Sequence, residues 1–147
     1  MNRIVIATDG SAPAQEAVEV GLELAAEHGA HVTFVHVVRP NEWHRGPSWM
    51  SRIRNGTQPE RFETALAEAA AAAEEAGVSY RLQRMSGDTV HEIIAVADAR
   101  DADLVILGSC RRGAVASALL GSVSSELIKR AERDVFVVET SPADVAA

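Results

Sequence analysis

A stretch rich in glycine, serine and arginine between residues 104 and 123 carries the residue types best suited to hold an anion. The apolar run Leu104–Leu107 ends at Gly108, and a new helical pattern begins at Gly121. A buried strand, a loop of small residues and a helix N-terminus together present backbone N–H groups, and the helix dipole favours negative charge. The pattern predicts a cradle for a phosphate group.

The start of that last helix, Gly121-Ser122-Val123-Ser124, is the strongest anion candidate. Glycine lets a backbone approach a ligand closely, and Ser122 could either cap the helix or donate to a phosphate oxygen. In the loop before it, Arg111 could bind a phosphate through two parallel hydrogen bonds or simply carry a solvated surface charge. The local sequence does not decide between the two roles of Ser122 or between the two roles of Arg111.

A second polar cluster follows the first apolar run of the chain, Ile4–Ala7. Thr8 and Asp9 come directly after it. The carboxylate of Asp9 could bond a ligand hydroxyl or amine, or help hold Mg²⁺ among phosphate oxygens. The alternative is a turn-forming aspartate before Gly10. We predict no catalytic residue, because the sequence shows no nucleophile elbow, positioned base or metal-ligand spacing.

Five short apolar runs alternate with helical patterns and would position these residues. Strands that alternate with helices predict parallel pairing through right-handed crossovers. Ligands of such sheets bind beyond the C-terminal ends of the strands, where the strand order reverses. If the first strand lies beside the fourth, Asp9 and Gly108 face each other across that crevice. The predicted strands are Ile4–Ala7, Val32–Val38, Val78–Gln83, Leu104–Leu107 and Val135–Val138.

Length and charge narrow the class of protein. The 147 residues suit one domain spanning 1–147, with a long connection at 39–56 and a frayed tail at 141–147. A net charge of −7 argues against nucleic acid and anionic membranes as partners. No apolar run reaches transmembrane length, and the N-terminus lacks the apolar stretch of a signal peptide. We therefore expect a cytoplasmic protein.

Taken together, these residues resemble the universal stress protein family over nearly the whole chain. The resemblance rests on Ile4–Ser11, His36-Val37, Ser86-Gly87-Asp88 and Gly108–Ser124. It implies an α/β fold with an open five-stranded parallel sheet in the order 3-2-1-4-5 and helices on both faces, Rossmann-like and adenine nucleotide alpha hydrolase-like. It also implies a homodimer through the last strand, Val135–Val138, whose apolar edge would need covering in a monomer.

The ATP-binding branch of that family carries a glycine, two residues, a second glycine, nine residues, and then Gly-Ser or Gly-Thr. Gly108 and Gly121-Ser122 hold the outer positions here, whereas Arg111 replaces the second glycine. Arg111 would either fill the space of the phosphates or swing out and clamp them. By resemblance, the residues around an adenine nucleotide would be Ala7, Thr8, Asp9, Val37, Leu107, Gly108, Arg111, Gly121, Ser122, Val123 and Ser124.

The resemblance implies a stress-response protein that binds an adenine nucleotide, ATP first, with Mg²⁺ reaching Asp9 only through the nucleotide. Its role would be regulatory, with at most weak ATP hydrolysis. The alternative is a family member that binds no nucleotide and acts through dimerisation or a partner protein. Arg111 and the connection at 39–56 favour that alternative.

Overall fold

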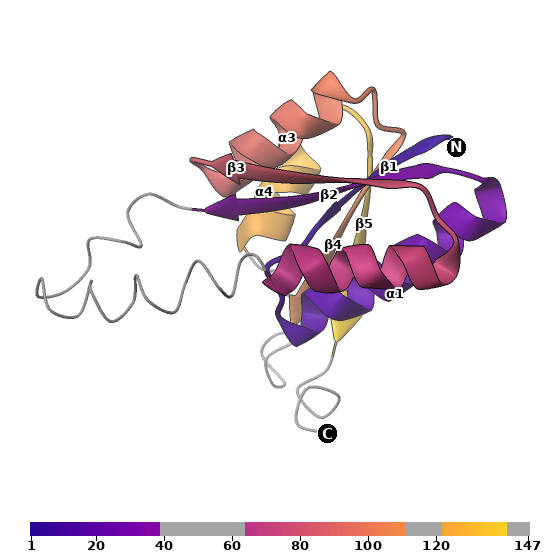
Figure 1. Cartoon of the computed structure of the whole chain (residues 1–147). Coiled ribbons are helices and arrows are strands. Elements are labelled where there is room, and N and C mark those ends of the chain that lie inside the picture. The colour runs from indigo at the N-terminus through magenta and orange to yellow at the C-terminus, as the bar shows by residue number, and fades with distance from the viewer. Residues whose placement is uncertain (39–63, 111–121, 141–147) are drawn as a thin grey trace, which may run out of the picture.

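A computed structural model describes residues 1–38, 64–110 and 122–140, which form a five-stranded parallel sheet in the order β3-β2-β1-β4-β5 (Figure 1). The predicted fold class and strand order are confirmed. The elements are β1 Arg3–Ala7, α1 Ala12–His28, β2 His31–Val38, a helix over residues 64–76, β3 Tyr80–Ser86, α3 Thr89–Ala99, β4 Leu104–Cys110, α4 Ser122–Arg130 and β5 Asp134–Thr140.

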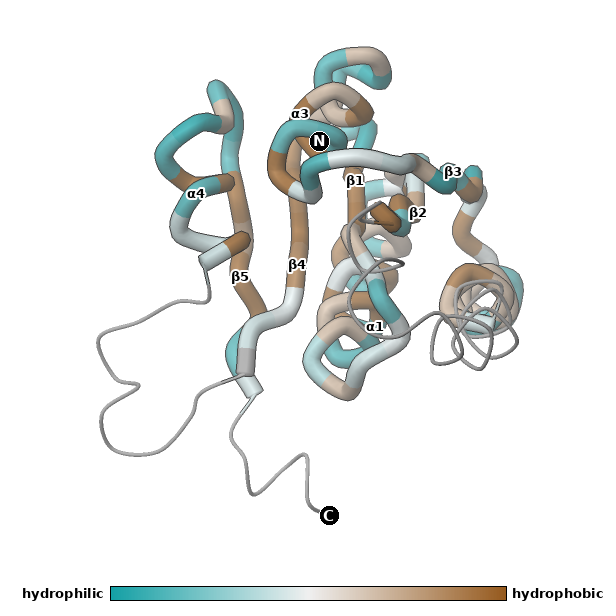
Figure 2. The backbone as a smooth tube through the Cα atoms, turned by 90° about the vertical axis from the view of Figure 1, so that its left-hand side faces the viewer, coloured by the Kyte–Doolittle hydropathy of each residue, from teal (hydrophilic) through white to brown (hydrophobic). Residues whose placement is uncertain are grey.

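Helices cover both faces of the sheet and create two apolar clusters. Successive side chains of a strand point to opposite faces, so Ile6 and Phe34 pack with α1 and the helix over 64–76. Val5 and Val35 pack with α3 and α4 on the other face. Figure 2 shows hydrophobic residues following one another along β1 and along the first part of β4. Burial on both faces explains why these strands are continuous apolar runs in the sequence.

Helix α1 begins after a serine cap, ends at a glycine and lies close against the sheet. The Ser11 hydroxyl accepts the Ala14 N–H at 3.4 Å, and Gly29 ends the helix in the left-handed conformation with φ of 64°. A Cβ added at Gly21 would lie 2.3 Å from Cδ1 of Ile6. The absence of a side chain at Gly21 therefore lets α1 approach β1, which places the first turn of α1 beside the C-terminal end of the sheet.

Three strands, β3, β4 and β5, continue past their apolar runs, and β5 (predicted to end at Val138) continues to Thr140. The sequence pattern ends the fourth strand before Gly108, but β4 continues to Cys110 because its backbone pairs in register with β5 up to Thr140. Likewise β3 lies over Tyr80–Ser86 rather than Val78–Gln83, paired with β2 as far as Val38. Backbone pairing at a sheet edge, and not side-chain hydropathy, sets these ends.

Several predictions fall outside the described residues: Arg111, Gly121, the connection at 39–56 and the tail at 141–147. Within the part of the chain that the structure describes, no helix is both long and apolar enough to cross a membrane.

Candidate functional site

A cavity of about 200 Å³ lies at the C-terminal ends of β1, β2 and β4. This is the edge where the strand order reverses and where ligands of such sheets bind. The predicted site residues that line it are Ala7, Thr8, Asp9, Val37, Leu107, Gly108 and Val123. The lining residues that the sequence did not single out for a site are Ser11, Ala14, Val35, His36, Thr89 and Ile93.

Two further predicted residues lie in α4 but not on the cavity wall. Ser122 is exposed and is the first helical residue of α4. Ser124 is buried in the first turn of the helix. Their neighbour Val123 is the α4 residue that reaches the cavity. The structure thus brings the start of α4 beside the ends of β1 and β4, with Ser122 at the helix N-terminus.

The turn after β1 is built by the side chains of Thr8 and Asp9. The Thr8 hydroxyl accepts the Gly10 N–H at 3.3 Å, and Oδ1 of Asp9 accepts the Ser11 N–H at 2.9 Å. Gly10 has a φ of 79°, a conformation that favours glycine. The turn-forming role weighed for Asp9 is therefore present. It uses one carboxylate oxygen, and Asp9 remains exposed at the cavity.

His36 joins the end of β2 to that turn. The imidazole is buried, and its Nδ1 lies 2.7 Å from the carbonyl oxygen of Thr8. A carbonyl oxygen only accepts hydrogen bonds, so Nδ1 carries the proton. The sequence offered one clue to this role, a polar side chain inside the apolar run Val32–Val38. Burial in a strand alone could not show that it faces Thr8.

Packing alone requires a glycine at position 108. A Cβ at this position would lie 2.1 Å from the carbonyl oxygen of Pro13 and 2.8 Å from the Ala14 nitrogen. The first turn of α1 therefore rests directly on the backbone of β4. The motif glycine has a structural explanation that does not depend on a bound phosphate.

Three helices begin at this cavity. Ser11 and Ala14 belong to the start of α1, Thr89 is the first residue of α3, and Val123 lies in the first turn of α4. The N-terminus of a helix carries a partial positive charge. The walls between them are apolar, notably Ile93 and Leu107. Such a cavity can accept an apolar ring on one side and negative charge on the other.

No group of three or more histidine, cysteine, aspartate or glutamate side chains in the described residues is placed to hold a metal ion.

Relatives of the chain are found by sequence. A universal stress protein of Methanocaldococcus jannaschii is 32% identical over 140 residues, which cover 93% of this chain and 81% of the relative. The chain spans 48% of matching universal stress proteins from Mycobacterium tuberculosis, so those relatives are about twice as long.

Solved structures share the fold. A universal stress protein solved in complex with cAMP has a TM-score of 0.69 at 27% identity, covering 95% of this chain and 98% of that one. A universal stress protein family protein from Arabidopsis thaliana, solved with AMP bound, has a TM-score of 0.73 at 18% identity, covering 98% and 95%. Residues 1–139 also match the sequence model of the universal stress protein family. This chain belongs to the universal stress protein family.

Proposed function

We propose that this protein binds an adenine nucleotide, ATP first, in the cavity at the ends of β1 and β4, as a regulatory stress-response protein. The observation that supports it most is the convergence of three helix N-termini on one partly apolar cavity. The AMP and cAMP complexes belong to other proteins, yet both are built on this fold.

Each part of the cavity suits one part of such a ligand. Val37 and Leu107 offer apolar surface to the adenine ring, and the second carboxylate oxygen of Asp9 can accept a ribose hydroxyl. The cavity, at about 200 Å³, is smaller than the ~300–1,000 Å³ of ordinary ligand pockets. We therefore expect it to enclose the nucleoside, with the phosphates extending to the start of α4.

The residues of the glycine motif would hold the phosphates in this proposal. Ser122 and Ser124 lie in the first turn of α4, and Gly121 and Arg111 would add a backbone N–H and a guanidinium. Mg²⁺, where present, would bind phosphate oxygens and reach Asp9 through them. The chain's own contribution is binding and orientation, so we expect at most weak hydrolysis of ATP.

Isothermal titration of the chain with ATP and with AMP, each with and without Mg²⁺, tests this function. We expect saturable binding, and we expect Asp9→Asn to weaken it about tenfold. Asparagine keeps an oxygen for the Ser11 N–H but lacks the charge, so the turn survives. Asp101→Asn, at the opposite edge of the sheet, is the control and should bind as wild type.

Absence of heat at millimolar nucleotide would overturn the proposal. It would leave the alternative, a member of the family that works through dimerisation or a partner. An equal loss of affinity in Asp9→Asn and Asp101→Asn would show that Asp9 has no special part.

We also propose a homodimer paired through β5. This strand is at one end of the sheet order, so its outer edge has no neighbouring strand within the described residues. Phe136 on it is 45% exposed. An unpaired apolar edge favours association, and a second copy of the same strand would cover it.

A further inference from the structure

A second cavity, of about 300 Å³, lies at the opposite edge of the sheet, where β1 and β2 begin. We call it the N-terminal cavity. Its polar lining consists of Arg3, His31, Thr33, Arg81 and Arg100. We propose that the N-terminal cavity binds a small anion that carries a phosphate group. The proposal does not depend on the nucleotide site, which lies at the other ends of the same strands.

The sheet register places these side chains together. Arg3 of β1 pairs with His31 of β2, and Thr33 of β2 pairs with Arg81 of β3. Paired residues of neighbouring strands lie on the same face, about 4.8 Å apart. Their odd numbers put them on the face of Val5, which packs with α3. Two adjacent rows of the sheet thus present basic and hydroxyl groups to one side.

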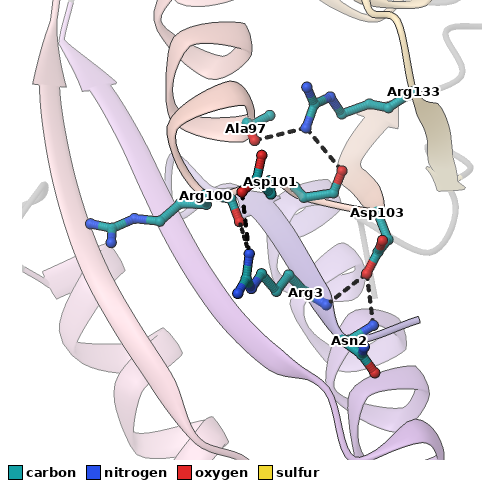
Figure 3. Close-up of polar contacts among 8 residues, drawn as sticks. Asn2, Arg3, Ala97, Arg100, Asp101, Asp103 and Arg133 are labelled. Atoms are coloured by element: carbon teal, nitrogen blue, oxygen red, sulfur yellow. Dashed lines mark hydrogen bonds and ion pairs between the residues drawn. The ribbon is translucent and has the colours of Figure 1, made fainter.

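Arg100, at the end of α3, lines the N-terminal cavity together with these side chains of the sheet. Its side chain points away from Arg3 and extends over β2 toward β3 in Figure 3. One terminal nitrogen donates to Oε1 of Gln83 at 3.5 Å, a long hydrogen bond. Its Nε is buried and has no hydrogen-bond partner among the described residues. A buried N–H donor without an acceptor destabilises the protein, and the oxygen of an oxyanion would supply the missing acceptor.

The negative groups near the cavity are already engaged. Asp101 lies 3.5 Å from Nη1 of Arg3. The Asp103 carboxylate accepts the N–H groups of Asn2 and Arg3, and these hydrogen bonds lower its pKa below the ordinary value (Figure 3). Arg81 and Arg100 form no ion pair with any described residue. Two guanidinium groups therefore remain uncompensated here, in a chain whose net charge is −7.

The C-terminus of α3 carries a partial negative charge, which would repel an anion. Arginine side chains that donate to carbonyl groups at this end of the helix offset that charge. Nη1 of Arg3 donates to the Arg100 carbonyl at 3.3 Å. Arg133 donates to the Ala97 and Ala102 carbonyls at 2.7 and 2.9 Å. Cations at these positions neutralise the negative end of the helix.

Phosphate is the ligand that this lining suits best. A guanidinium offers parallel N–H donors that match two oxygens of a phosphate, and the Arg81 and Arg100 groups can do so from two sides. Thr33 and His31 add smaller donors. The volume is at the lower end of ordinary ligand pockets, which leaves room for a small organic group beside the phosphate.

A ¹⁵N–¹H correlation titration of the chain with inorganic phosphate, at low ionic strength, tests the proposal. We expect saturable shifts at the amides of Arg3, Thr33, Arg81 and Arg100. Arg81→Ala should weaken binding about tenfold. Arg84→Ala is the matched control. It removes an exposed arginine from the same strand, but on the other face, and should leave affinity unchanged.

Glycerol 3-phosphate in a parallel titration identifies the source of the phosphate. Tighter binding than inorganic phosphate assigns the cavity to a phosphate monoester, and equal binding assigns it to free phosphate. Chloride at matched ionic strength must not reproduce the shifts.

Three results would overturn the proposal: no saturable shift at this edge, identical shifts with chloride, or equal losses in Arg81→Ala and Arg84→Ala. Shifts confined to Thr8, Asp9 and Gly108 would place the phosphate in the other cavity. That outcome would overturn this inference while leaving the nucleotide proposal intact.

Discussion

Gly108 and Gly21 both allow α1 to lie close to the sheet, but they meet different atoms. A Cβ at Gly108 would strike the backbone of Pro13 and Ala14, whereas one at Gly21 would strike the far end of the Ile6 side chain. A backbone clash is relieved only by moving a helix, while a side-chain end can rotate. The two positions therefore differ in what a methyl group costs.

We predict that Gly108→Ala destabilises the protein by about 3 kcal/mol, because overpacking forces α1 away from β4. Gly21→Ala should cost about 1 kcal/mol, since alanine's helix propensity, worth about 1 kcal/mol, offsets part of the strain. Urea unfolding of the two variants measures the difference. An unfolding midpoint of Gly108→Ala equal to that of the wild type would show that the contact between β4 and α1 tolerates a side chain.

At the scale of single residues, the sequence predicted seven of the thirteen residues that line the cavity. It did not predict the contacts that hold these residues in place. Residues directly after a parallel strand must lie at one edge of the sheet, so Thr8, Asp9 and Gly108 were predictable. The contact of Gly108 with Pro13 joins positions far apart in the chain, and the bond from His36 to Thr8 joins two strands. Contacts of this kind depend on the tertiary arrangement, which local patterns do not encode.

At the scale of elements, α3 depends on a side chain from outside it. Arg133 lies between α4 and β5, yet its Nη1 donates to the Ala97 carbonyl (Figure 3). Arg133 also donates to the Ala102 carbonyl and pairs with Asp98. The last carbonyls of a helix have no partner within the helix. One arginine thus satisfies the end of α3 and the start of the loop that follows it.

We predict that Arg133→Ala lowers the free energy of unfolding by about 2 kcal/mol, because two part-buried carbonyls lose their donor. Arg133→Lys should recover only part of this loss, since an ammonium group lacks the planar fork. Arg130→Ala is the control and should stay within about 0.5 kcal/mol of wild type. Thermal and urea unfolding of all three variants measure the effect. A loss in Arg130→Ala as large as that in Arg133→Ala would contradict it.

Hydropathy predicted where elements exist better than where they end. The five predicted strands all exist, and the helices α1 and α3 between them begin after the polar caps Ser11 and Asp88. The polar ends of β3 and β4 were missed, because Ser86 and Ser109 belong to strands through backbone pairing alone. Polar side chains at the rim of a sheet carry no periodic signal.

At the scale of the whole molecule, the two ends of the sheet order both expose a large apolar residue. Phe136 on β5 is 45% exposed and Leu82 on β3 is 42% exposed. The proposed dimer uses the β5 edge only. Substitutions of Phe136 and of Leu82 therefore test which edge of the sheet forms the dimer.

We predict that Phe136→Glu converts the dimer to a monomer, because two-fold pairing of β5 would bring like charges together. Leu82→Glu should leave the dimer intact. Sedimentation equilibrium gives the masses, and circular dichroism checks that both variants fold. A wild-type monomer, or dissociation by Leu82→Glu alone, would contradict the arrangement.

The pairing of β1 with β4 has a consequence for synthesis. Ile4 pairs with Leu104 and Ile6 with Ile106. One edge of β1 therefore stays unpaired until β4, about 100 residues later in the chain, has been synthesised. At ribosomal rates of about 5–20 residues per second, one edge of β1 stays open on the order of ten seconds. A long-range parallel pairing also closes slowly. The nascent chain is therefore most prone to aggregate before β4 leaves the ribosome, and chaperones that shield strand edges would act on it then.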